Sequence, residues 1–280
     1  MKENQTLTDI LSSISLRFGE ILRSENPDLL IVQGDTSTVA ISALIAFYEK
    51  IPVGHVEAGL RTYDLSSPFP EEGNRQIVSR LAQYNWAPTE KAAQQLKDEN
   101  IHDVFVTGNT VIDACLNFNY PVTYNNKVLI TLHRRENFGE RMEKIFSEIE
   151  ELAQNKPDLE FIFPMHPNPN VQKLKGMLQH VNVIDPLGYA EMMKLLSCVK
   201  FAISDSGGIQ EECAAFGKKV LVCRNTTERP EGIEAGFAKL VGTEVKSHFN
   251  WANDDSRWSG ENPYGKGDAA QKIIDTLIVK

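Results

Sequence analysis

The sequence predicts an α/β protein with two doubly wound domains. Short apolar runs that suit buried parallel strands alternate with amphipathic stretches that suit helices along most of the 280 residues. The alternation breaks once, in an irregular segment at 117–126, and then starts again. A hydrophobic content of 41% over this length is enough for one large or two medium domains. Two successive series of strands and helices therefore favour two doubly wound sheets.

The first series begins with a helix at 7–25, where apolar residues recur at three- and four-residue steps, and the Asn-Pro pair at 26–27 ends it. The apolar run 29–34 predicts a strand, 37–50 a helix, and 52–59 a second strand. A polar loop reaches Glu72. The remaining elements expected in this half are a helix at 74–84, a strand at 85–89, a helix at 89–99 and a strand at 104–109.

The second series restarts at Lys127. The expected strands are the apolar runs 127–133, 159–166, 181–186, 200–208 and 218–224. The expected helices are 140–155, 170–179, 189–197, 209–216 and, after a turn-rich segment, about 267–279. We therefore expect domains at 1–118 and 119–265, followed by a C-terminal helix within 266–280.

Composition excludes several classes of protein. The formal net charge of −9 and the pI near 5.3 argue against a nucleic-acid partner, which would need a surplus of Lys and Arg. The four cysteines lie far apart without a Cys-x-x-Cys pair, so neither a zinc site nor a disulfide framework is indicated. The polar start lacks a signal-peptide core, and no apolar run of about 18 residues could span a membrane. We expect a cytoplasmic protein.

The segment 201–213, FAISDSGGIQEEC, predicts a phosphate cradle. A strand leads through a Gly-Gly turn into a helix, whose first-turn N–H groups and dipole favour an anion. Gly207 and Gly208 would let an oxyanion approach the backbone, Ser206 would add a hydroxyl, and Glu212 could reach a ribose diol. A Gly-Gly turn alone would equally fit an ordinary strand-to-helix connection.

Basic residues follow neighbouring strands of the second half. Arg224 and Arg229 follow the strand after the cradle, although structural salt bridges would explain them equally well. His166 follows a buried strand in a proline-rich loop, where a cationic imidazole could neutralise a departing pyrophosphate, or the ring could move a proton. His133 and Arg134 close another apolar strand, which favours a local positive patch over a solvated charge run.

The first half supplies carboxylates at strand ends or in loops. Asp35 follows one strand, Glu57 ends the next, and Glu71 and Glu72 lie in the loop after it. Partly buried carboxylates can exchange protons with a sugar carbon or hydroxyl. The structural alternatives are N-capping of the next helix by Asp35 and compensation of a helix dipole by Glu71 or Glu72.

Eight motifs along the chain resemble those of one enzyme family. In order they are GDTST, PVGHVEAGLRT, PFPEEGNR, ITLHRREN, HPNPN, SDSGGIQEE, TTERPEG and NPYGKG. In this order, from about residue 5 onward, the chain resembles the bacterial and archaeal non-hydrolysing UDP-N-acetylglucosamine 2-epimerases. The resemblance implies two Rossmann-like domains of the GT-B type, with the last helix crossing back to the first domain. It also implies a homodimer.

Carried over by position, the resemblance assigns residues to roles. The acid and base residues fall on Asp35, Glu57 and Glu71, and the catalytic histidine on His166. The other assigned residues are expected to bind UDP. They are Leu187 and Met192, through their main chain, and Ser206, Gly207, Gly208, Glu212 and Arg229. Arg75, His133 and Arg134 are additional candidates.

The implied reaction is reversible epimerisation at C2 of a UDP-N-acetylhexosamine. UDP leaves C1 as the C2 proton is removed, and UDP then returns to the bound 2-acetamidoglucal while C2 is protonated from the opposite face. The resemblance implies neither NAD nor a metal. The sequence agrees, because it has no Gly-x-Gly-x-x-Gly after a strand and no metal-ligand spacing.

The chain departs from the family at its start. Members usually open with a strand and a GTRPE-like loop, whereas Met1 here opens into what resembles a later helix. We expect that roughly the first quarter of the family's length is absent, which would leave the first sheet incomplete with an unpaired edge. A truncated, inactive nucleotide-sugar-binding protein is therefore one alternative. A hydrolysing epimerase or a UDP-glycosyltransferase of the same fold is another.

Overall fold

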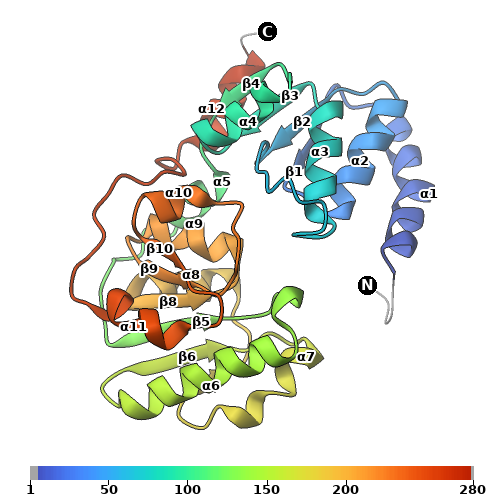
Figure 1. The fold of residues 1–280 in the computed structure, drawn as a ribbon. Coiled ribbons are helices and arrows are strands. Elements are labelled where there is room, and N and C mark those ends of the chain that lie inside the picture. Colours follow the sequence, from blue (N-terminus) through green and yellow to red (C-terminus); the bar gives the residue numbers. More distant parts are fainter. Residues whose placement is uncertain (1–5, 279–280) are drawn as a thin grey trace. The chain divides into compact units, whose positions relative to one another are not determined.

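The computed structural model describes residues 6–278 and divides into two compact units. Unit 1 comprises Met1–Thr110 with Asp268–Lys280, and unit 2 comprises Val111–Gly267. Each unit has its own parallel sheet (Figure 1). The expected α/β architecture is therefore confirmed. The division after Thr110 falls earlier in the chain than the expected boundary at 118.

Unit 1 has a sheet whose strands follow chain order, β1-β2-β3-β4. The strands are β1 (Leu30–Gln33), β2 (Val53–Val56), β3 (Tyr84–Ala87) and β4 (Val104–Val106), and all pairs are parallel. On β2 every residue is buried. The apolar run at 29–34, which was expected to be buried, instead forms the edge strand β1, on which only Val32 is buried.

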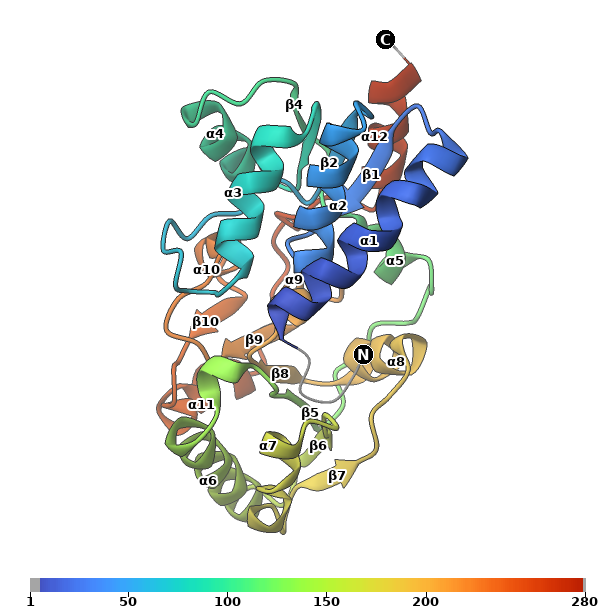
Figure 2. The ribbon, with the colours of Figure 1, turned by 90° about the vertical axis from the view of Figure 1, so that its right-hand side faces the viewer.

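The helices of unit 1 are α1 (Leu7–Glu25), α2 (Ser37–Tyr48), α3 (Glu71–Leu81), α4 (Glu90–Asp98) and α12 (Ala269–Ile278). Thr6 and Asp9 form a capping box at the start of α1, and Asn26 ends it in the left-handed conformation. Helix α1 lies beside α2 (Figure 2), where Leu22 and Ala43 join one apolar cluster.

Two expectations for unit 1 need correction. Helix α3 begins at Glu71 instead of residue 74, and Tyr84 belongs to β3 instead of the helix end. The last helix, α12, packs within unit 1. Its expected end at residue 279 lies outside the described residues. The indole Nε1 of Trp86 donates to Thr276 Oγ1 at 2.8 Å, and Ile273 joins the apolar cluster around Trp86.

Unit 2 has a parallel sheet in the order β10-β9-β8-β5-β6-β7. The strands are β5 (Lys127–Thr131), β6 (Glu160–Pro164), β7 (Asn182–Ile184), β8 (Phe201–Ser204), β9 (Lys219–Val222) and β10 (Ala238–Leu240). The chain runs outward from β5 to β7 and then returns to the other side of β5 (Figure 2). The strand order therefore reverses between β5 and β8, the position where open α/β sheets bind ligands.

The helices of unit 2 are α6 (Glu140–Asn155), α7 (Pro169–Gln172), α8 (Tyr189–Cys198), α9 (Gly207–Ala215), α10 (Pro230–Glu234) and α11 (Val245–Asn253), with 3-10 turns at Arg135–Asn137 and Lys175–Met177. Helix α5 (Thr110–Leu116) begins at the division between the units. The expected helix at 170–179 is wrong. Gly176 weakens a helix there, and the segment instead forms α7, which buries Val171, and a separate 3-10 turn, with the buried Leu174 between them.

A glycine after β2 provides a test of the packing in unit 1. Gly59 has φ +92°, and a Cβ at this position would lie 2.3 Å from the backbone oxygen of Ala92. We expect Gly59→Ala to lower the free energy of unfolding by about 3 kcal/mol in urea titrations. Gly73→Ala on α3 is the control, because nothing lies within 4 Å of its Cβ position. Equal stability of the two variants would contradict this packing.

Candidate functional site

The cradle, residues Ser206–Gly208, lies at the carboxyl end of β8. Ser206 is the N-cap of α9 but makes no cap hydrogen bond with its side chain, and its N–H donates to Ser204 Oγ at 2.9 Å. Gly207 and Gly208 open the helix, so their N–H groups have no acceptor within it. A Cβ on Gly208 would meet only Ser206 Oγ, at 3.9 Å. The cradle therefore offers a hydroxyl and helix N–H groups to an anion.

The two arginines after β9 belong to a buried ion-pair network. Arg224 pairs with Glu136 and Glu228, each at 2.8 Å, and Arg229 pairs with Glu228 and Glu211, each at 2.5 Å. Both guanidinium groups are almost fully buried. For both arginines the sequence left open the alternative of structural salt bridges, and the structure shows such salt bridges.

Arg229 nevertheless touches the cradle. A Cβ on Gly207 would lie 2.5 Å from Arg229 NH1. Since two buried carboxylates hold the guanidinium in place, it supports the backbone at the start of α9. Position 207 therefore requires glycine because the Arg229 side chain occupies the space of a Cβ.

Asp205 is a functional candidate that the sequence analysis did not single out. Its carboxylate is fully buried and accepts hydrogen bonds from the main-chain N–H groups of His133 and Arg134 and from Asn137 Nδ2, at 2.9 to 3.1 Å. Asp205 directly precedes the cradle. Its hydrogen bonds therefore hold the loop after β5 next to the cradle. An acidic residue directly after a fully buried strand was the available signal.

Two of the histidines of unit 2, His133 and His166, stack on each other. The ring centroids of His133 and His166 are 5.1 Å apart, with an angle of 18° between the planes. Burial lowers the pKa of His133, which favours its neutral form. His166 is exposed, and its Nδ1 accepts from the main-chain N–H of Asn168 at 3.1 Å. In the neutral ring of His166 the proton therefore resides on Nε2, which is left as an outward donor.

Glu212 lies on α9 and hydrogen-bonds the hydroxyl of Tyr189, the first residue of α8. Burial raises the pKa of Glu212 to about 7. Of the two residues expected to contact a base through their main chain, Leu187 precedes α8 and Met192 lies in its first turn. The Met192 N–H already donates to Gly188 O at 2.9 Å.

In unit 1, Asp35 is held by residues of α3. Its carboxylate pairs with Arg75 at 2.7 Å, and its main-chain oxygen accepts from Asn74 Nδ2 at 2.9 Å. Arg75 also pairs with the buried Glu72 at 3.1 Å. The N-cap of α2 is Thr36, so the capping role considered for Asp35 is wrong. The Asp35 side chain remains 27% exposed and accessible to a ligand.

The two glutamates at the start of α3 differ in their surroundings. Glu72 is fully buried and accepts from the main-chain N–H groups of Thr62 and Tyr63 as well as from Arg75. These bonds give Glu72 a structural role. Glu71 is only half-buried, which leaves its carboxylate as the one of the pair that can meet a substrate.

Glu57 follows β2 in an unusual backbone conformation. Its φ is +65°, a left-handed value that costs a residue with a side chain about 1–2 kcal/mol. A Cβ on Gly34 would lie 3.6 Å from Glu57 Oε2, so this carboxylate lies beside the residue that precedes Asp35. Strained residues of this kind cluster at functional sites. Unit 1 thus brings Asp35 and Glu57 to the same edge of its sheet.

Comparison with known proteins identifies the family. A protein-family model described as UDP-N-acetylglucosamine 2-epimerase matches residues 1–278. The UDP-N-acetylglucosamine 2-epimerase of Campylobacter jejuni is 42% identical over 99% of this chain and 82% of its own length. The chain belongs to the UDP-N-acetylglucosamine 2-epimerase family.

Solved structures of epimerases from this family share the fold. The Neisseria meningitidis UDP-GlcNAc 2-epimerase bound to UDP-GlcNAc is 41% identical, with a TM-score of 0.92 over 100% of this chain and 84% of that one. The Methanocaldococcus jannaschii UDP-GlcNAc 2-epimerase in complex with UDP-GlcNAc and UDP is 32% identical, with a TM-score of 0.85 over 99% and 83%. The GT-B-like fold expected from the resemblance is confirmed. This chain is shorter than these relatives.

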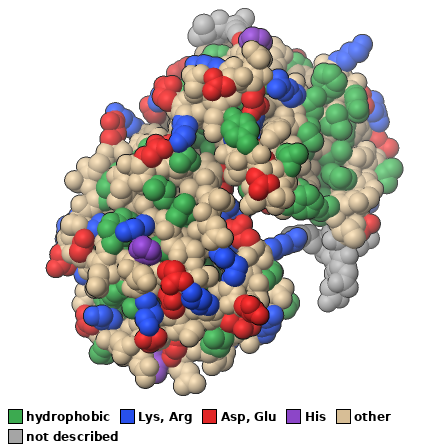
Figure 3. Space-filling model, in the orientation of Figure 1, with side chains coloured by type: hydrophobic (Ala, Val, Ile, Leu, Met, Phe, Trp, Pro, Cys, Tyr) green, Lys and Arg blue, Asp and Glu red, His purple; other side chains and the backbone are tan. Residues whose placement is uncertain are grey.

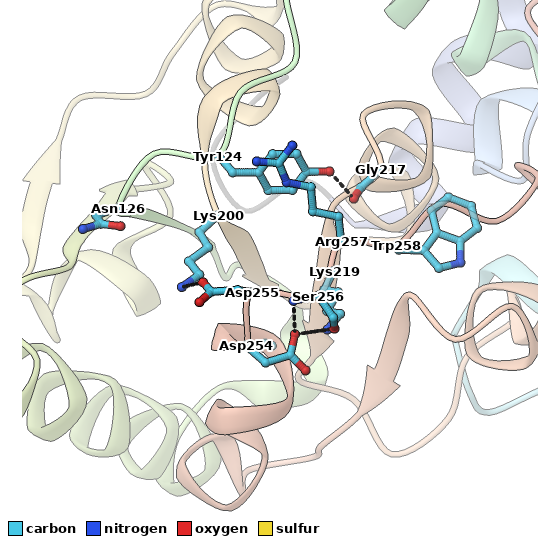
Figure 4. Close-up of a pocket in the computed structure, with 11 residues that line it drawn as sticks. Tyr124, Asn126, Lys200, Gly217, Lys219, Asp254, Asp255, Ser256, Arg257 and Trp258 are labelled. Carbon is cyan, nitrogen blue, oxygen red and sulfur yellow. Dashed lines mark hydrogen bonds and ion pairs between the residues drawn. The ribbon is translucent and has the colours of Figure 1, made fainter.

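A cavity of about 220 Å³ in this epimerase-family chain lies away from the cradle, at the amino ends of the strands in unit 2 (Figure 4). Asn126 precedes β5, Lys200 precedes β8 and Lys219 begins β9. Lys219 pairs with Asp254 at 2.5 Å and Lys200 with Asp255 at 3.1 Å. Both lysines are therefore already paired with carboxylates within the protein.

Within residues 6–278, no cluster of at least three His, Cys, Asp or Glu residues is arranged to hold a metal ion. Over the same part of the chain, no helix combines the length and the apolar character that crossing a bilayer requires.

Glu212 predicts a specific dependence of stability on pH. Its pKa is about 7 in the folded protein against an ordinary value of 4.5, so between these values the folded state holds a proton that the unfolded state has released. This contribution stabilises the fold below pH 4.5 and is lost as the pH rises to 7. We expect Glu212→Gln to be more stable than the parent above pH 7, with the difference vanishing near pH 4.5. Urea titrations at a series of pH values would give the free energy of unfolding of both proteins. If it changed with pH in the same way in the parent and in Glu212→Gln, the buried state of Glu212 would be contradicted.

Proposed function

We propose that this protein interconverts UDP-N-acetylglucosamine and UDP-N-acetylmannosamine by reversible epimerisation at C2. The observation that carries the proposal is the 42% identity over 99% of the chain to an enzyme named UDP-N-acetylglucosamine 2-epimerase. The geometry supports it, because unit 2 offers an anion cradle and unit 1 offers carboxylates beside one sheet edge. Neither NAD nor a metal takes part in the proposed reaction.

Unit 2 holds the UDP portion in this proposal. The diphosphate is bound by the Ser206 hydroxyl and by the N–H groups of Gly207 and Gly208, with the dipole of α9 favouring its charge. Arg229 supports this backbone from behind Gly207. Glu212 accepts from a ribose hydroxyl, in place of its bond to Tyr189. Main-chain groups near Leu187 and Met192 meet the uracil.

His166 acts on the leaving group. Its Nε2–H donates to a diphosphate oxygen as the bond from C1 breaks, which stabilises the charge that develops there. His133 supports the His166 ring by stacking, and Arg134 adds positive charge at the same loop. This arrangement uses the Nε2–H of His166 as a hydrogen-bond donor, because Nδ1 already accepts from Asn168.

Unit 1 manages the proton at C2. One carboxylate takes the C2 proton as the C1–O bond breaks and UDP departs with the bonding electrons, leaving a C1=C2 double bond in 2-acetamidoglucal. UDP then adds back to C1 while a second acid protonates C2 from the opposite face. Proton removal from one face of C2 and protonation from the other require two acid–base groups. These groups come from the set Asp35, Glu57 and Glu71. Arg75 holds the Asp35 carboxylate in place.

We also propose that the protein is a cytoplasmic homodimer formed through unit 1. Support comes from the family resemblance and from apolar side chains that gather over α1 and α2 (Figure 3). The large exposed apolar residues of these helices are Leu11, Leu16, Ile21, Phe47 and Tyr48. Analytical ultracentrifugation would test this, and a monomer at micromolar concentration would contradict it.

Proton NMR of UDP-N-acetylglucosamine in heavy water tests the proposed reaction. We expect deuterium at C2 and the anomeric signal of UDP-N-acetylmannosamine, because the protonating acid exchanges with solvent before C2 is reprotonated. Release of free N-acetylmannosamine and UDP would indicate a hydrolysing enzyme instead. UDP binding without exchange at C2 would support the alternative of an inactive nucleotide-sugar-binding protein.

A further inference from the structure

One buried imidazole in unit 1 takes no part in the proposed proton transfers. His55 lies on β2 with no exposed surface, and its register partners are Val32 on β1 and Asn85 on β3. Burial lowers its pKa to about 4, so the ring is neutral at neutral pH. Its position inside the sheet excludes direct contact with a substrate.

The two ring nitrogens of His55 have different surroundings. Nε2 lies 2.8 Å from the main-chain oxygen of Gly34. Because a carbonyl oxygen only accepts, the proton of the neutral ring resides on Nε2. Nδ1 is buried without a hydrogen-bond partner among the described residues. An apolar side chain would avoid this orphaned acceptor, so packing alone does not explain a histidine here.

The bond from His55 fixes the turn that carries the carboxylates. Gly34 has φ +80°, and its N–H donates to Val56 O at 3.0 Å while its oxygen accepts from His55. Asp35 follows Gly34 directly, and the strained Glu57 comes two residues after His55. Gly34 is therefore held on both sides at the point where the two carboxylates meet.

We propose that His55 is a positioning residue, whose Nε2–H fixes the Gly34 carbonyl and so sets the geometry of Asp35 relative to Glu57. Arg75 and Asn74 hold Asp35 from α3, whereas His55 acts from the strand that also leads into Glu57. The proposal rests on the proposed function. It requires that the turn be held to a fraction of an ångström for proton transfer.

Three variants separate positioning from simple stability. His55→Leu removes the donor and the orphaned nitrogen together. His55→Gln places an amide N–H near the Gly34 oxygen. Asn85→Leu is the matched control, because Asn85 is also fully buried, pairs in register with His55 and has an orphaned Oδ1. For each variant, kcat, KM, the Kd for UDP and the thermal midpoint are measured, and the crystal structure is determined.

We expect His55→Leu to reduce kcat about 10- to 100-fold, because small misplacements of catalytic groups have effects of this size. Its Kd for UDP and its thermal midpoint should stay near those of the parent. His55→Gln should recover kcat to within about fivefold of the parent. Asn85→Leu should leave kcat unchanged. In the structure of His55→Leu, the Gly34 carbonyl should turn and the Asp35 carboxylate should shift.

Either of two results with His55→Leu would overturn the proposal. One is full kcat in His55→Leu, and the other is an unchanged Gly34–Asp35 turn in its structure. A loss of kcat in Asn85→Leu equal to that in His55→Leu would indicate a general disturbance of the sheet and would also overturn it. A parent protein that binds UDP but never deuterates C2 would contradict the proposed function alone, since the structure of His55→Leu still decides whether His55 fixes the turn.

Discussion

Glu57→Gln should reduce kcat for epimerisation by roughly 10²- to 10⁴-fold, the range expected when a general acid or base is removed. Glutamine has nearly the same shape but cannot exchange a proton with C2. The strained φ of +65° at this position is already present and is not relieved by glutamine. UDP affinity should be unchanged, because the proposed contacts to UDP lie in unit 2.

The measurement combines steady-state kinetics, the Kd for UDP by calorimetry, and deuteration of C2 in heavy water. Asp64→Asn is the control, because Asp64 lies exposed in the loop before α3 and its carboxylate bonds only Ser66 among the described residues. Its kinetics should match the parent. Full turnover in Glu57→Gln would remove Glu57 from the set of acids and bases and leave Asp35 and Glu71 to serve both faces.

The sequence was sufficient for most of the strands and most of the helices. A strand such as β8, with every residue buried, is mostly apolar, and such runs are visible without a structure. Short elements were missed. Helix α10 and strand β10 are too short for a period to show, and Gly176 interrupts the pattern at 170–179.

The candidate site could be predicted only in part. Residues within a motif, such as Ser206 to Gly208, could be placed because their neighbours in sequence define the helix start. Partners that come from distant parts of the chain could not. Arg75 holds Asp35 from 40 residues away, and Asp205 binds the loop at His133 from 72 residues away. Pairings of this kind depend on which loops the sheet order brings together.

The adjacent glycines of the cradle should respond differently to alanine. Gly208 lies in the first turn of α9. In Gly208→Ala the new Cβ enters open space beside this turn, where only Ser206 Oγ lies within 4 Å. Alanine is also a better helix former, so the thermal midpoint should stay equal or rise. If the diphosphate occupies that space, overpacking of about 1–3 kcal/mol would weaken UDP binding about tenfold to a hundredfold.

In Gly207→Ala the Cβ would instead lie 2.5 Å from Arg229 NH1 and 2.9 Å from its Cζ. A flexible arginine could move aside, but Glu211 and Glu228 hold this one, and its exposed fraction is only 7%. The variant must therefore disturb a buried ion-pair network, and we expect both stability and UDP affinity to fall. Calorimetric titration with UDP and thermal unfolding of both variants provide the measurement.

The contrast between the two positions is what locates the diphosphate. A variant at 207 that loses both stability and affinity would fit any helix start whose packing has been disturbed. A variant at 208 that keeps its stability and loses only affinity requires a ligand group in the space that the new methyl fills. Unchanged UDP affinity in Gly208→Ala would mean that this space is merely solvent, and the N–H groups of α9 would then not be the diphosphate site.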